Sequence, residues 1–552
     1  LEANPAHKNK SGSRIGRYGT WWACAFSGIT LWAAFPPLGW WPLAWLAPLG
    51  WLWLVTRPKL PGHHPYRVLY VASWLHWMAV LQWVRLPHWS AYFGWVTLTA
   101  YLAIYPPLFV AISRCAIRQR RWRVVWVAPL VWAGLEFFRC WFLTGFAMGL
   151  LGHTQAPQLR VIQVCDLGGV YLLSLLLMTF AASLLLACQS SRWAERATAM
   201  TLAVLVPVLV ISYGHWRLNH VRDSQSARMA RVALIQGSVD TVFDDPSDPE
   251  DVFRDYLKLT HEALSPESAV DLVVWPESMY TGRLPWIEFQ LPAQPPDDFE
   301  MSDSELRERL EHWHTSSRER ARWAARQTHT PMLVGCESDE YGPHRPRRYN
   351  SALWFDAAGD LRGRYDKMHP VMFGEYVPLG SIFPSLYRLT PMGDGLTAGQ
   401  EALAVKAGDL VLSPSICFEN IVPHLLRRQV RQLAERGESA DVLVTITNDG
   451  WFWGSSLLDM HLACGVFRAV ELRKPLLIAA NTGFSAVVGA DGAIQQRGPR
   501  RATGYLVTDV RATNAGSMYL AYGDWLGVLA TLFCAGVVST RGVSACRVPW
   551  SA

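Results

Sequence analysis

Long apolar stretches alternate with short basic loops over the first 220 residues of the chain. Windows of about 19 residues predict about eight membrane-spanning helices. These predicted spans lie near 20–36, 40–56, 66–84, 91–113, 122–138, 167–188, 197–216 and 518–540. Residues 220 to 515 instead carry the mixed charge of a domain that faces water. The pattern therefore predicts a helical membrane part that is interrupted by one large polar domain.

Within that polar domain, short β-branched runs alternate with amphipathic stretches, which is typical of an α/β fold. Buried strands are predicted at 232–235, 272–275, 332–335, 410–412, 442–446 and 476–479. Helices are predicted between them at 251–264, 304–326 and 456–474. The segment 285–325, rich in proline and then in charge, is predicted to be a surface insertion. The expected fold is a sandwich of central sheets covered by helices.

The charges of the loops predict the topology, because every second loop between the spans is basic and basic loops stay in the cytoplasm. Both termini are then cytoplasmic, and the polar domain lies on the outer side of the membrane. The predicted organisation is a cytoplasmic segment at 1–19, a membrane domain at 20–217, an α/β domain at 228–512, a final span at 518–540 and a cytoplasmic tail at 541–552.

Composition agrees with this organisation and limits the classes of partner. Hydrophobic residues make up 51% of the chain and charged residues 17%, with 28 tryptophans, as expected for lipid contact and aromatic belts at the membrane surface. The net charge of +6 lies mostly in short loops beside the spans, so no nucleic-acid partner is predicted. The ten cysteines form no CxxC pair and glycine-rich phosphate loops are absent, so neither a metal nor a cofactor is expected.

Three reactive side chains follow predicted strands, where active-site groups of α/β folds collect. Glu277, shielded by Trp275, could act as a general base, or it could simply cap the next helix. Lys367 could stabilise an oxyanion, or it could be a solvated loop lysine. Cys417 stands where a strand runs into a turn, as a nucleophile would, although most single cysteines are inert core residues. Each signal alone leaves both readings open.

Taken together, the segments 273–278, 364–370 and 413–420 resemble the nitrilase superfamily in order and in flanking residues. The resemblance runs from 233–237 to 489–492. With about seven spans before this domain and one after it, the chain resembles the membrane-embedded apolipoprotein N-acyltransferase family. Further matches are Trp132, Glu136, Phe137, Arg139, 144–146, Gln155, 373–378, 448–452, His461 and 468–472. One departure is Val242-Phe243, where the family often has Lys-Trp.

The resemblance implies an αββα sandwich and a role for each matched residue. Glu277 would be the general base, Lys367 the oxyanion-stabilising residue and Cys417 the nucleophile, while a backbone N–H near Phe418 would help to hold the oxyanion. The resemblance adds a set of supporting residues: Glu375 and Glu419, which would orient the site, Trp451 near the substrate entrance, and Glu136 and Arg139, which would pair with each other or meet a lipid head group.

The resemblance also implies the reaction and its partners. A fatty acyl chain would pass from a phospholipid, through a thioester on Cys417, to the N-terminal amino group of the diacylglyceryl-cysteine of an apolipoprotein. Membrane lipids would surround the enzyme in the bacterial cytoplasmic (inner) membrane, with the catalytic domain on the periplasmic side. Two alternative functions are open for the same sequence. One is a membrane-tethered amidase acting on small amides, and the other is a transporter or scaffold with an inactive domain.

Overall fold

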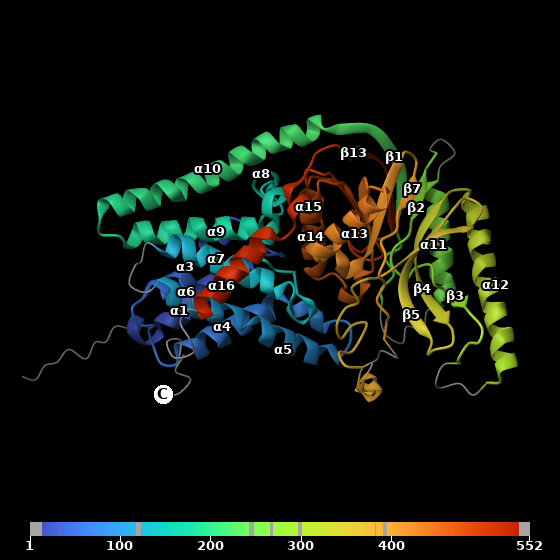
Figure 1. Cartoon of the computed structure of the whole chain (residues 1–552), viewed down its shortest axis with the longest axis horizontal. Helices are drawn as coiled ribbons and strands as arrows, with labels where there is room; N and C mark the ends of the chain where they lie inside the picture. The colour runs from blue at the N-terminus through green and yellow to red at the C-terminus, as the bar shows by residue number, and fades with distance from the viewer. Residues whose placement is uncertain are drawn as a thin grey trace, which may run out of the picture.

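The computed structural model describes residues 14–117, 123–241, 248–264, 269–295, 301–380, 382–389 and 395–539. An apolar helical region and an α/β domain lie side by side, at the left and the right of Figure 1. The predicted tail at 541–552, the greater part of the predicted segment 1–19, and Val242-Phe243 lie outside the described residues. The order of parts expected from the hydropathy pattern is therefore observed.

The helical region is built mainly from segments that the apolar pattern predicted. Its helices are α1 (Arg14–Ala34), α2 (Leu43–Leu46), α3 (Leu49–Thr56), α4 (Pro65–Val80), α5 (Ala91–Leu102), α6 (Tyr105–Ile117), α7 (Val124–Arg139), α8 (Leu159–Ile162), α9 (Cys165–Gln189), α10 (Trp193–Asp223), α15 (Met518–Tyr522) and α16 (Trp525–Ser539). The predicted span 40–56 is divided because Pro42 and Pro48 start new helices and cannot donate a helical hydrogen bond.

By length and composition, three helical stretches of the described chain could cross a membrane: 91–117, 165–189 and 193–223. Shorter apolar helices cover Leu43–Thr56 and Trp525–Ser539. The structure thus contains an apolar helical region with candidate spans. The total of about eight spans and the domain boundaries drawn from them stay predictions.

The last described helix, α16, packs on α7 through a glycine. The hydroxyl of Thr531 donates to the carbonyl of Gly134, 397 positions earlier, at 3.0 Å. A Cβ at Gly134 would lie 2.7 Å from the backbone of Ala530, so only glycine permits this approach. The helix that follows the α/β domain therefore belongs to the same bundle as the helices that precede it.

The strands of the described residues form two sheets. The first has the order β13 (Gly504–Thr513), β1 (Gln225–Gln236), β2 (Leu272–Val274), β4 (Met332–Tyr341), β5 (Arg347–Phe355), β6 (Leu361–Asp366), with β3 (Trp286–Phe289) beside β4. The second has the order β12 (Ile494–Arg497), β11 (Ala486–Val488), β10 (Leu476–Ala480), β9 (Val442–Thr447), β8 (Leu410–Ile416), β7 (Val405–Ala407). Each sheet has a parallel centre, β1–β2–β4 and β8–β9–β10, flanked by antiparallel strands.

The two sheets face each other across a buried apolar layer that includes Leu234 and Val274 from the first and Leu412 and Val444 from the second. Helices α11 (Pro249–Ala263) and α12 (Asp303–Thr328) lie on the outer face of the first sheet, at the far right of Figure 1. Helices α13 (Pro423–Glu435) and α14 (Leu457–Leu472) lie between the second sheet and the helical region. The expected αββα sandwich is confirmed.

The predicted insertion 285–325 is more integrated than a surface arm, as far as it is described. It supplies β3, which extends the first sheet by pairing with β4, and most of α12. The start of α12 is fixed by a capping box, in which Ser302 and Glu305 satisfy each other's backbone N–H groups. Periodicity predicted the helix, whereas a strand of four residues between prolines gave no clear pattern.

The junction between the two parts is an apolar core with one buried ion network. A single core cluster contains residues of α7, α9, α13 and α14. Beside it, the carboxylate of Asp166 in α9 accepts from Arg217 of α10 at 2.5 Å and from Arg473, just after α14, at 2.8 Å. All three side chains are buried. Since buried charges are stable only when paired, this network fixes the α/β domain against the helices.

Candidate active site

Glu277 follows β2 and is held by polar groups from two other strands. Its Oε1 accepts from the side-chain amide of Asn350 in β5 at 2.7 Å. Its Oε2 accepts from the backbone N–H of Asn448, which follows β9, at 2.9 Å. Only 6% of its surface is exposed. A carboxylate fixed in this way has a defined orientation and can accept a proton without moving.

Lys367 follows β6 and lies between two carboxylates. Its Nζ donates to Oε1 of Glu375 at 2.6 Å and to Oε1 of Glu277 at 3.3 Å, and the side chain is 1% exposed. Burial alone lowers the pKa of Lys367, but Glu375 and Glu277 raise it, and the net shift of the pKa is upward. The other oxygen of Glu375 accepts from the backbone N–H of Val371 at 2.7 Å. Lys367 therefore stays cationic and has a fixed position.

Cys417 is the first residue of a short 3-10 helix, η6 (Cys417–Ile421), directly after β8. Its φ of +52° lies in the left-handed region, which is strained for a residue with a Cβ. The side chain is partly exposed, unlike those of Glu277 and Lys367. Burial and the charge of Glu277 raise the pKa of the thiol well above its ordinary value, although Lys367 lowers it. The resting thiol is therefore protonated and needs a base to become a nucleophile.

Glu419 holds this turn to the loop that carries Lys367. Its carboxylate accepts from the backbone N–H of Ile416 at 2.7 Å, from that of Met368 at 2.7 Å and from the hydroxyl of Tyr365 at 2.7 Å. The side chain is fully buried, and burial raises the pKa of its carboxyl group. The carboxylate thus connects the nucleophile turn with the lysine loop, 50 positions apart in sequence.

Phe418 and Trp451 belong to two short 3-10 helices that follow β8 and β9. The ring of Phe418 stacks on His369, next to the lysine loop, with 5.8 Å between ring centres. Trp451 belongs to η7 (Asp449–Phe452). Its neighbour Phe452 makes an edge contact with Trp83 of the helical region at 5.2 Å between ring centres. An aromatic contact between Phe452 and Trp83 therefore connects η7 of the α/β domain with the helical region.

Glu136 and Arg139 of α7 are placed elsewhere, with backbone partners in the turn that follows the helix. Glu136 accepts from the N–H of Leu151 at 2.7 Å, and Arg139 donates to the carbonyl of Met148 at 3.2 Å. The guanidinium of Arg139 also lies 5.0 Å from the ring centre of Trp77. In the structure, Glu136 and Arg139 therefore hold the backbone that follows α7. Their predicted contact with a lipid head group stays a prediction.

Several residues of the site received no role from the sequence, although 448–452 and His461 were among the positions that match the family. Asn350 lies inside an antiparallel strand, and no local pattern distinguishes it. Asn448 and Asp449 follow β9, at the same kind of strand end as Glu277 and Cys417, and this position was the available signal. His461 in α14 contacts Asp449, with 3.0 Å between Nδ1 and Oδ1. Its Nε2 lies 3.1 Å from the carbonyl oxygen of Cys417.

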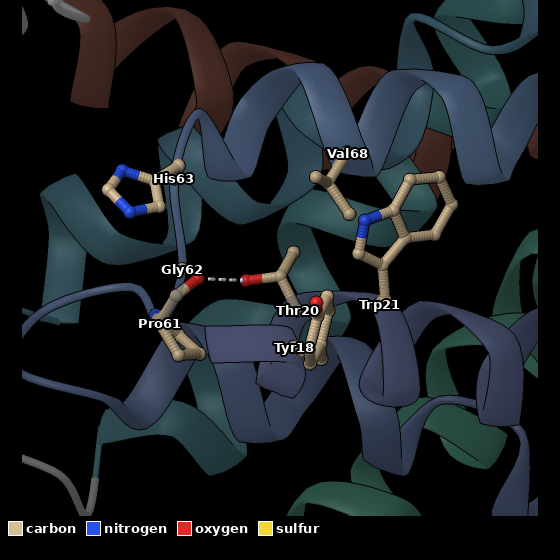
Figure 2. A pocket seen from close by; sticks show the side chains of 7 residues that line it. All are labelled: Tyr18, Thr20, Trp21, Pro61, Gly62, His63 and Val68. Atoms are coloured by element: carbon tan, nitrogen blue, oxygen red, sulfur yellow. Dashed lines mark hydrogen bonds between the residues drawn. The ribbon is translucent and has the colours of Figure 1, made fainter. Parts of the chain in front are cut away.

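A thiol, a carboxylate and an ammonium group that meet at strand ends can perform acyl transfer through a covalent thioester. Among the described residues, no group of three histidine, cysteine or acidic side chains is arranged to hold a metal ion. A cavity of about 170 Å³ lies apart from this chemistry, at the start of α1, where Thr20 donates to the carbonyl of Pro61 (Figure 2). Its lining includes none of the catalytic candidates.

Comparisons with known proteins cover both parts of the chain. The model of the apolipoprotein N-acyltransferase N-terminal domain matches residues 27–183, and the carbon-nitrogen hydrolase model matches residues 231–519. An apolipoprotein N-acyltransferase of Rhodopirellula baltica is 31% identical over 92% of this chain and 94% of its own. That of Geobacter metallireducens is 33% identical over 90% of each chain. An amidase structure from Nesterenkonia sp. is 21% identical, covers 53% of this chain and 92% of its own, and has a TM-score of 0.36.

Proposed function

The chain belongs to the apolipoprotein N-acyltransferase family, and we propose that it transfers a fatty acyl chain from a phospholipid to an apolipoprotein through a thioester on Cys417. The observation that carries the proposal is the placement of Lys367. The structure fixes its ammonium between Glu277 and Glu375, and its charge acts on the thiol of Cys417. This arrangement provides a base, a nucleophile and an oxyanion partner in one place.

The first half-reaction forms the acyl-enzyme. Glu277 takes the proton of the Cys417 thiol, and the sulfur attacks the ester carbonyl of a phospholipid. Lys367 and the N–H of Phe418 stabilise the negative oxygen of the tetrahedral intermediate. When the C–O bond breaks, Glu277 returns the proton to the leaving oxygen. The products are a lysophospholipid and a thioester on Cys417.

The second half-reaction uses the same groups with an amine in place of the thiol. The free α-amino group of a diacylglyceryl-cysteine attacks the thioester carbonyl, and Glu277 accepts the amine proton. The C–S bond breaks, the amide forms, and the proton returns to the sulfur of Cys417. Glu277 and Lys367 are buried while Cys417 is partly exposed, which supports an approach of both substrates from the side of Cys417. Exclusion of water favours aminolysis over hydrolysis.

The architecture supports lipid-anchored substrates at both steps. The shared apolar core and the Asp166 network hold the catalytic domain directly on the apolar helices. A phospholipid and a diacylglyceryl protein can therefore approach from the bilayer without leaving it. We place the enzyme in the bacterial inner membrane as a multi-pass protein, with its catalytic domain on the periplasmic side.

Mass spectrometry of the full-length protein tests the proposal. After incubation with phospholipid alone, the peptide that contains Cys417 should gain the mass of one fatty acyl chain, and addition of a diacylglyceryl-cysteine peptide should remove it. Cys417→Ala should abolish the adduct, whereas Cys188→Ala, at an exposed cysteine at the end of α9, should retain it. An adduct that survives Cys417→Ala excludes the thioester. Ammonia release from small amides, without acyl transfer, would support the amidase alternative instead.

A further inference from the structure

A second polar pair contacts the nucleophile from the side of its backbone. Asp449 lies in η7 and His461 in α14, and both are buried. Nδ1 of His461 is 3.0 Å from Oδ1 of Asp449, and Nε2 is 3.1 Å from the carbonyl oxygen of Cys417. The hydroxyl of Thr447 donates to the same oxygen of Asp449 at 3.2 Å. The imidazole thus bridges a carboxylate and the peptide group of the nucleophile.

The two contacts of His461 determine its protonation state. A neutral imidazole has one N–H and one lone pair, but both of its nitrogens here face an oxygen that only accepts. An imidazolium donates from both nitrogens, and the carboxylate of Asp449 balances its charge. Burial alone lowers the pKa of His461, but Asp449 raises it by charge and by hydrogen bonding, and the net shift of the pKa is upward. Both the hydrogen-bond partners and the upward shift of the pKa therefore indicate that the imidazole of His461 is protonated.

The contact of His461 with the carbonyl oxygen of Cys417 holds the backbone at a strained residue. In a planar trans peptide the C=O and the following N–H point in opposite directions. Fixing the carbonyl of Cys417 at His461 therefore fixes the direction of the Phe418 N–H. On the other side of the residue, Glu419 holds the N–H of Ile416 at 2.7 Å. His461 thus holds the peptide group that follows the left-handed Cys417, and Glu419 holds the peptide group that precedes Ile416.

The geometry points to His461 as a positioning residue that, as an imidazolium paired with Asp449, clamps the carbonyl of Cys417 and aims the Phe418 N–H at the acyl carbonyl. This inference rests on the proposed function, because it assigns that N–H to the oxyanion of acyl transfer. The hydrogen bonds described for His461 are to Asp449 and to the carbonyl oxygen of Cys417. It acts through the backbone of the nucleophile.

The charged surroundings of His461 make its ionisation observable. From η7 it faces Asp449, and from the end of β2 the carboxylate of Glu277 also raises its pKa. The pocket at this position is otherwise lined by neutral side chains: Asn420, Leu458, Leu462, Ile478 and Phe484. Because the pKa of Lys367 is raised above its ordinary 10.5, Lys367 stays charged beyond the range in which a histidine titrates.

The test is the pH profile of acyl-enzyme formation by the full-length protein with phospholipid. In the wild type, the rate should fall at a pH above 6.5, where His461 loses its proton. Asp449→Asn should move this fall to lower pH by about one unit or more. His461→Gln, which can still donate to the carbonyl without a charge, should remove the fall and lower the rate about tenfold or more. His261→Gln, on α11 with its own backbone contacts, should leave the profile unchanged.

Each outcome decides between the two proposals. A wild type that forms no acyl-enzyme overturns the proposed function itself. An active wild type whose rate shows no fall between pH 6.5 and 10 overturns the imidazolium clamp, even if a variant fails to fold. Folded variants with the wild-type profile also overturn it, and so do folded variants that are slower but keep the fall at the same pH as the wild type.

Discussion

Neutralising Glu375 should slow acylation by loosening Lys367. In Glu375→Gln the side chain keeps its shape but loses its charge, and the ammonium of Lys367 keeps only Glu277, at 3.3 Å instead of the 2.6 Å contact. Lys367 then shifts towards Glu277 and competes for the carboxylate that must accept the thiol proton. Both the base and the oxyanion partner are therefore affected by a residue that does not touch the sulfur.

The size of the effect follows from the lost contact. A charge-assisted hydrogen bond contributes about 1.5–3 kcal/mol, and it is strongest when it is short and buried. If the variant loses about 2–3 kcal/mol of transition-state stabilisation, the acylation rate should fall by roughly 30- to 150-fold. The fold should persist, because Val371 can still donate to the amide oxygen that replaces its present acceptor.

Single-turnover acylation measures this directly, as the time course of the acyl adduct on Cys417 with phospholipid in excess. Glu401→Gln is the matched control, since Glu401 pairs with Arg436 at 3.4 Å but is largely exposed, where an ion pair contributes little. Acylation by Glu375→Gln within about threefold of the wild-type rate would refute the assigned role of Glu375. An equal loss of rate in Glu401→Gln would indicate that removing any negative charge slows acylation, whatever its position.

Three further predictions concern stability. Asp166→Asn leaves two buried guanidinium groups without a carboxylate and should destabilise the protein by about 3–5 kcal/mol, which a lower melting temperature in detergent would show. Gly214→Ala should destabilise the protein by about 1–3 kcal/mol, because the added Cβ would lie 1.7 Å from the carbonyl oxygen of Arg160. The control Gly94→Ala should not destabilise it, because a Cβ at Gly94 meets nothing within 4 Å. Equal melting temperatures of the two variants would contradict this prediction. Burial raises the pKa of Glu471 to about 7 from 4.5, so its contribution of about 3 kcal/mol is full below pH 4.5 and lost as the pH rises through 7. Glu471→Gln should remove that slope from melting temperatures measured across this range, and an unchanged slope would exclude the assignment.

The parts of the site that stand at strand ends could be predicted from the sequence. Buried apolar runs before Glu277 and Cys417 identify parallel strands, one in each sheet, and active-site groups of α/β folds collect at the carboxyl ends of such strands. The resemblance then added Glu375 and Glu419, and the structure places both against the lysine loop. The local pattern succeeds here because a strand buried on both faces has a continuous apolar signature.

The remaining features depend on contacts that no local pattern contains. Strand β5 begins with Arg347-Arg348, and the exposed strand β12 has no apolar run, so neither resembles a strand in sequence. Asn350 can donate to Glu277 only because the fold brings β5 close to the end of β2. Asp166 and Arg473 are 307 positions apart, and their pairing follows from how the two parts of the protein dock. Such pairings require tertiary structure.

The contact between α16 and α7 sets an order of assembly. Gly134 lies in the first quarter of the chain, and its partner Thr531 is translated 397 residues later. The whole α/β domain must therefore be synthesised before α16 can join the helix bundle. Until then, the face of α7 beside Gly134 lacks its contact with Ala530 and Thr531. A ribosome stalled after residue 513 would hold a chain whose catalytic strands are complete but whose bundle is still unclosed.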